Sequence, residues 1–155
     1  MKYRICLLMI GVLLLSSCSM LLRTDAPMER FSFSHSGMRS DSIYTLTAEK
    51  TAKGWQAHFN LFMTQDFTLP MTQADADALY ALLDDCSLWA WNGFHKVDPI
   101  VSDGRSFKLD VRFEDGRELT ASGGNKFPDG YGAAENAIKT VFIQIMETNG
   151  MENPF

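Results

Sequence analysis

The chain has 155 residues, of which 46% are hydrophobic and 21% are charged, and its formal net charge is −5. An acidic body without a run of Lys and Arg argues against a nucleic-acid partner, because nothing in the sequence neutralises phosphates. Three cysteines are too few for a disulfide framework, so stability must come from an ordinary hydrophobic core.

The first residues have the pattern of an export signal. Two cations, Lys2 and Arg4, precede an apolar run over residues 5–15, which is followed by two serines and Cys18. The run is shorter than the roughly 20 apolar residues that a bilayer-spanning helix needs. We therefore expect a cleaved signal peptide over residues 1–17, the alternative being an uncleaved signal anchor.

The order Leu15-Ser16-Ser17-Cys18 resembles the lipobox of bacterial lipoproteins. The resemblance implies lipidation at Cys18, with diacylglycerol on the sulfur, cleavage before the residue and a fatty acid such as palmitate on the new amino group. Two or three acyl chains hold a protein at a membrane almost irreversibly. The expected location is the bacterial cell envelope. Ser19 resembles the outer-membrane sorting choice, so the outer membrane is expected if the source is Gram-negative.

Cleavage would leave 12 Lys and Arg against 19 Asp and Glu, a formal net charge of −7. Cys6 would leave with the signal and Cys18 would carry lipid, so Cys86 would remain without a disulfide partner. We expect residues 18–28 to be the lipidated cysteine and a polar tether, residues 29–149 to be one globular domain, and residues 150–155 to be a C-terminal tail.

Alternating apolar and polar side chains predict strands in the first half of the domain. The expected strands cover residues 31–35, 43–50, 55–63 and 67–69, with Met63 facing the core and Pro70 confining the last strand to an edge.

Two segments have helical spacing. Thr72 and Asp75 are placed for a capping box, and Leu79, Leu82, Leu83 and Cys86 form one apolar stripe, which makes Cys86 a core residue rather than a reactive thiol. This helix is expected to end between Ser87 and Asn92. A second helix is expected over residues 131–148.

A hairpin is expected around Asp115-Gly116. A two-residue loop would place apolar and polar side chains on the same face, whereas a three-residue loop with a left-handed Gly116 pairs Arg112 with Glu118 and Val111 with Leu119. Strand runs interrupted by two helices predict an α+β fold: an antiparallel sheet of about five to six strands with both helices packed on one face.

No pattern of catalytic or metal-binding residues stands out. The three histidines have neither i, i+2 nor i, i+4 spacing, so we expect ordinary surface or edge histidines, with no metal and no cofactor. No serine lies in a nucleophile elbow, so no catalytic residue is expected.

One corner of the chain has the composition of a binding surface. Asn125, Lys126 and Phe127 follow a glycine-rich strand end, and Trp91 is expected nearby. The other interpretation is that these aromatic residues fill a structural corner and that Asn125 holds the turn.

The segments Trp91-Asn92-Gly93-Phe94, Phe113-Glu114-Asp115-Gly116 and Gly124-Asn125-Lys126-Phe127-Pro128 resemble uncharacterised small lipoproteins of bacteria. This resemblance implies one structural unit and brings no activity. The expectation is a membrane-anchored envelope lipoprotein whose domain binds an envelope protein or cell-wall component without catalysis. The alternatives are a periplasmic hydrolase and a lipoprotein-type enzyme inhibitor.

Overall fold

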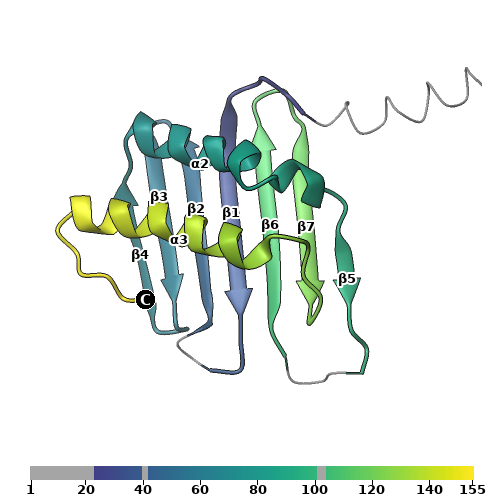
Figure 1. Cartoon of the computed structure of the whole chain (residues 1–155). Helices are drawn as coiled ribbons and strands as arrows, with labels where there is room; N and C mark the ends of the chain where they lie inside the picture. The colour runs from purple at the N-terminus through teal and green to yellow at the C-terminus, as the bar shows by residue number, and fades with distance from the viewer. Residues whose placement is uncertain (1–22, 40–41, 101–103) are drawn as a thin grey trace, which may run out of the picture.

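The computed structural model describes residues 23–39, 42–100 and 104–155. The expected signal peptide and Cys18 therefore lie outside the described residues. Figure 1 shows the described part as a sheet with helices packed across one face. In chain order the elements are β1 (Met28–Ser36), β2 (Tyr44–Thr51), β3 (Gly54–Leu61), β4 (Gln65–Pro70), α2 (Gln73–Asp85), η2 (Leu88–Trp91), β5 (His95–Val97), β6 (Ser106–Phe113), β7 (Glu118–Gly124) and α3 (Tyr131–Thr148).

The seven strands form one mixed sheet in the order β4-β3-β2-β1-β6-β7-β5. All neighbours are antiparallel except β5, which runs parallel to β7. The expected α+β class is confirmed, but the expected five to six antiparallel strands were too few. The missed strand is β5. All three of its residues are exposed. Because β5 has no buried face, its sequence gives no alternating pattern of apolar and polar side chains from which to predict a strand.

Both helices cross the same face of the sheet (Figure 1). The side chains that alternate toward the helices are buried in every long strand, for example Phe33 in β1, Phe59 in β3 and Leu109 in β6. Among the described residues, no helix covers the opposite face, which carries the polar side chains of the same strands. The sheet thus has a helix-covered face and an open polar face.

The β6–β7 hairpin has the predicted register. Arg112 faces Glu118 and Val111 faces Leu119. Gly116 has φ of 81° and its N–H donates to the carbonyl of Phe113 at 2.9 Å, which closes the three-residue loop. The prediction from burial is confirmed because only this register places every apolar side chain toward the helices.

The strand expected over residues 55–63 ends earlier than predicted. Leu61 is the last residue of β3, and Phe62 and Met63 then take left-handed φ values of 55° and 60°. Thr64 N–H donates to the carbonyl of Leu61 at 3.1 Å, so the chain reverses here. Met63 is 75% exposed, and the expectation that it faces the core was wrong.

The first helix begins with the predicted capping box of Thr72 and Asp75. It ends at Asp85, slightly before the expected boundary, because Ser87 takes a left-handed φ of 53° and the chain continues as the short helix η2. Cys86 is half-buried against the core, and burial raises the pKa of its thiol. Pro70 ends β4, which lies at the sheet edge as predicted.

Candidate functional site

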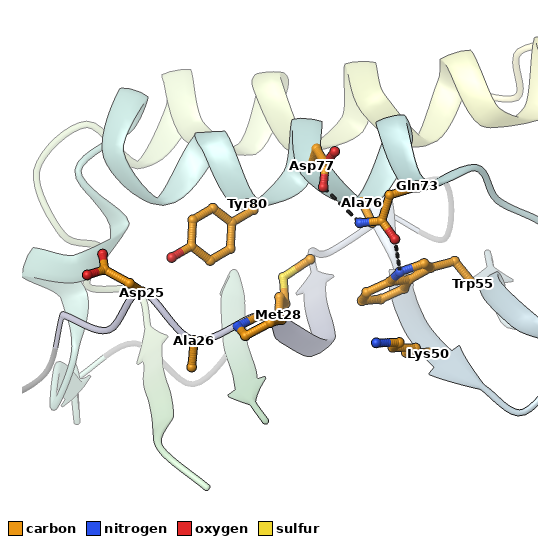
Figure 2. Close-up of a pocket in the computed structure, with 10 residues that line it drawn as sticks. Asp25, Ala26, Met28, Lys50, Trp55, Gln73, Ala76, Asp77 and Tyr80 are labelled. Carbon is orange, nitrogen blue, oxygen red and sulfur yellow. Dashed lines mark hydrogen bonds between the residues drawn. The ribbon is translucent and has the colours of Figure 1, made fainter. Parts of the chain in front are cut away.

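A cavity lies between α2 and the segment that leads into β1, and we call it the α2 pocket (Figure 2). It has a volume of about 560 Å³. Small-molecule pockets are typically about 300 to 1,000 Å³ and combine apolar walls with a few polar groups. The lining fits that description: Asp25, Ala26, Pro27, Met28, Lys50, Trp55, Gln73, Ala76, Asp77 and Tyr80.

A chain of side-chain hydrogen bonds orders one side of the pocket. The indole N–H of Trp55 donates to Oε1 of Gln73 at 3.2 Å, and Nε2 of Gln73 donates to Oδ1 of Asp77 at 2.8 Å (Figure 2). Gln73 and Asp77 are one turn apart on α2, so the helix sets their spacing. The nearly buried Trp55 ring is thereby fixed in orientation, with the Asp77 carboxylate beside it.

The opposite wall is formed by residues 25–28, which lead into β1 and include its first residue, Met28. Tyr80 O–H donates to the carbonyl of Thr24 at 2.8 Å, and the Thr24 hydroxyl donates to Oδ2 of Asp115 at 2.7 Å. The hydrogen bond from Thr24 lowers the pKa of Asp115. Glu114 N–H also donates to the carbonyl of Pro27 at 2.9 Å. This segment, expected to be part of a tether, is held between α2 and the β6–β7 turn.

Charges at the pocket are carboxylates and one ammonium group. Asp25 and Asp77 contribute the carboxylates, while the Lys50 ammonium lies 2.7 Å from Oε1 of Glu114. Together with the Trp55 and Tyr80 rings, these groups can contact an apolar body and accept hydrogen bonds from its polar groups. The lining contains no Ser, Cys or His that could act as a nucleophile or base.

The structure places the sequence-predicted residues at a different corner. Trp91 is 2% exposed, its indole N–H donates to the carbonyl of Asp129 at 3.3 Å, and its ring stacks on Tyr131 with centroids 5.9 Å apart. Phe127 is half-buried with its centroid 4.5 Å from that of Tyr131. Trp91 and Phe127 line one groove of about 410 Å³.

Asn125 and Lys126 are not among the residues that line this groove. Asn125 has φ of 55°, its N–H donates to the carbonyl of Arg105 at 2.7 Å, and its Oδ1 accepts from the N–H of Arg105 at 2.9 Å. Lys126 is exposed. Gly123 is required for close approach, since a Cβ there would overlap the Lys126 carbonyl and the Phe107 ring. The contacts of Asn125 are those of a turn-holding residue.

One histidine differs from the expectation of surface or edge positions. His35 is 5% exposed at the end of β1, with Nδ1 2.7 Å from the Tyr131 hydroxyl. Burial lowers the pKa of His35, and it raises the pKa values of Tyr44 and Tyr131. The expectation of a surface or edge position was wrong for His35. Side chains alternate along residues 31–35, so His35 points to the same core-facing side as Phe31 and Phe33. Phe31 and Phe33 signalled that face.

The other two histidines contact polar neighbours on exposed strands. His58 Nε2 lies 2.7 Å from Oδ1 of Asp66, and His95 Nδ1 lies 2.9 Å from the Ser122 hydroxyl. A serine hydrolase needs a third group to orient the histidine and a site that binds substrate beside the serine. The α2 pocket and the groove of Trp91 and Phe127 are not lined by Ser122 or His95.

Sequence reasoning missed the α2 pocket because its residues come from four separate segments. The strongest signal available was Trp55, a large aromatic residue at the very start of a strand, followed by the polar first turn of a helix. Within residues 23–39, 42–100 and 104–155, no helix is both long and apolar enough to cross a bilayer. Comparison with models of protein families finds no match, and no curated protein matches the sequence.

Proposed function

We propose that this protein is a lipid-anchored envelope protein whose domain binds a small cell-wall component in the α2 pocket without catalysis. The observation that carries the binding part is the pocket itself, a volume of about 560 Å³ with an ordered aromatic wall and two carboxylates in its lining. The anchor part rests on the signal-like residues 1–17 and the lipobox that ends at Cys18.

The position of the pocket supports linking these two parts. Four residues lie between Cys18 and Arg23, and the five steps from one Cα to the next span at most about 18 Å in an extended chain. Arg23 is held at the same end of the domain, where it forms an ion pair with Asp84 of α2 at 2.7 Å. A chain lipidated at Cys18 would therefore keep the α2 pocket close to the membrane surface.

The lining favours one chemical kind of ligand. Trp55 and Tyr80 offer aromatic faces, whereas Asp25 and Asp77 are acceptors of hydrogen bonds and partners for an ammonium group. The ligand should thus have an apolar body and several N–H or O–H donors. Soluble peptidoglycan fragments carry the amide and hydroxyl donors of that chemistry and are the probe of choice.

The test titrates the ¹⁵N-labelled full-length chain, purified in nonionic detergent, with a muropeptide mixture. We expect a saturable shift of the Trp55 indole resonance, because that N–H lies on the pocket wall. Asp77→Asn should weaken binding about tenfold, because one hydrogen bond from the ligand to a charged group is lost. Asp85→Asn, the same change on an exposed residue of α2 outside the pocket, should leave binding unchanged. Equal affinities of the two variants would reject the pocket as the site.

A further inference from the structure

The open face of the sheet carries a second cavity, which we call the open-face hollow. Its volume is about 140 Å³. Its lining residues form three directly facing pairs of β1 and β6: Arg30 with Arg112, Ser32 with Asp110, and Ser34 with Lys108. Three cations thus surround one carboxylate and two hydroxyls in an otherwise acidic protein.

A β-bulge places Arg30 in the open-face hollow. Met28 pairs with Phe113 and Arg30 pairs with Arg112, so Glu29 is an extra residue in β1. Met28 is buried on the helix-covered side, whereas two residues later Arg30 faces the other way. Bulges commonly redirect a side chain in this manner. In a regular strand, residues two apart such as Met28 and Arg30 share one face.

One atom of the Arg30 guanidinium is buried and unsatisfied. This atom, Nε, has no hydrogen-bond partner, and no ion pair joins the group to another described residue. Arg112 is different, because its Nε lies 3.1 Å from Oε1 of Glu118 and 3.7 Å from Oδ1 of Asp110. Two like charges directly opposite on neighbouring strands repel each other, and a buried donor without an acceptor is costly. An anion between them would relieve both effects.

We propose that the open-face hollow binds a phosphoryl group. The lining has a formal charge of +2, and a phosphate monoester carries about −1.5 to −2 at pH 7. Guanidinium groups pair with phosphate oxygens through two parallel N–H donors, and the serine hydroxyls add further donors. This site lies on the opposite face from the α2 pocket and is independent of the function proposed for that pocket.

The three cations of the hollow form a cluster that the sequence did not reveal. The sequence has no basic run, because Arg30 is far along the chain from Lys108 and Arg112. The register of β1 with β6 brings the three together. Because the fold brings these residues together, the cluster does not show as a run of positive charges in the sequence.

The experiment titrates the full-length chain in nonionic detergent with inorganic phosphate and measures binding by calorimetry at constant ionic strength. Saturable binding is expected for the wild-type chain. Arg30→Gln and Lys108→Gln should each weaken it at least tenfold. Lys53→Gln, which removes one exposed positive charge at the β2–β3 turn, should leave the affinity unchanged.

A melting curve shows that each variant is folded and gives a second readout. Phosphate should raise the melting temperature of the wild-type chain but not of Arg30→Gln. Tighter binding of short-chain phosphatidic acid than of inorganic phosphate would identify a lipid headgroup as the source, and the reverse order would identify a free phosphoryl ligand. Equal affinity of the wild-type chain and Arg30→Gln, or a response no larger than that to sodium chloride, would overturn the proposal.

Discussion

The hydroxyl of Tyr131, the first residue of α3, lies 2.7 Å from Nδ1 of His35 near the end of β1. The two rings also stack, with centroids 6.2 Å apart. Tyr44 of β2 also stacks with His35, at a centroid distance of 5.6 Å, and its hydroxyl donates to Oε1 of Glu135 at 2.7 Å. This cluster joins the sheet to the start of α3 through groups that titrate.

The first prediction is that stability falls as the pH is lowered from 7 to 5. Burial lowers the pKa of His35, with Arg105 and Lys139 acting in the same direction and Glu135 opposing them. An unfolded histidine titrates at about 6.5, so below that pH the unfolded chain binds a proton that the folded chain lacks. The free energy of unfolding should therefore decrease until the pH passes below the folded pKa. Urea denaturation at constant ionic strength measures it.

Two variants separate His35 from the other titrating groups. His35→Phe keeps the stacked ring but cannot bind a proton, so its loss of stability between pH 7 and pH 5 should be smaller than that of the wild-type chain. His58→Gln, which removes a histidine on the open face, is the matched control. A loss of the same size in His35→Phe would show that other groups cause it.

The second prediction concerns the two faces of the β6–β7 hairpin. Val111 is fully buried and Arg112 pairs with Glu118 at 3.1 Å on the open face. Val111→Ala should lower the free energy of unfolding by about 2 kcal/mol, because apolar groups are lost and a cavity remains. Arg112→Ala should cost less than about 1 kcal/mol, since exposed ion pairs contribute little. Urea denaturation of the two variants would contradict the assigned faces if the order were reversed.

The third prediction concerns the corner at Asn125. Asn125→Ala removes the acceptor for the N–H of Arg105 and places alanine at φ of 55°, so we expect a loss of about 2 kcal/mol. Asn125→Gly removes the same acceptor without the strain and should cost less. Lys126→Ala, at an exposed side chain, should be nearly neutral in the same urea denaturation series. Wild-type stability of Asn125→Ala would refute a structural role.

Regular alternation made part of this fold predictable. Residues 107–113 alternate without interruption, and the burial of Leu109 and Val111 admits only one register across the turn. The same reasoning failed at Met63, because left-handed φ values at Phe62 and Met63 reverse the chain without a glycine to signal the turn. It also failed at β5, whose parallel pairing with β7 depends on contacts remote in sequence.

The candidate sites were less predictable than the fold. Trp91 and Phe127 do line one groove, as their aromatic composition indicated, yet Asn125 beside them holds the backbone. The α2 pocket depends on where residues 25–28 are held, and hydrogen bonds from Tyr80 and Glu114 determine that position. No local pattern encodes such contacts. Strict alternation from Met28 would have placed Arg30 on the helix-covered face. The bulge at Glu29 instead leaves Arg30 on the open face, in the open-face hollow.

The last prediction tests the anchor on which the proposed location depends. A lipobox cysteine supplies the sulfur that is acylated before cleavage, so Cys18→Ser should accumulate as an uncleaved precursor that contains Lys2 and Arg4. The wild-type chain should incorporate a fatty-acid analogue and partition into detergent, because two or three acyl chains bind a membrane almost irreversibly. Cys86→Ser is the matched control, since Cys86 is half-buried beside α2, and it should be processed and labelled normally. Absence of label on the wild-type chain would end the lipoprotein proposal, while binding in the α2 pocket would remain open to its own test.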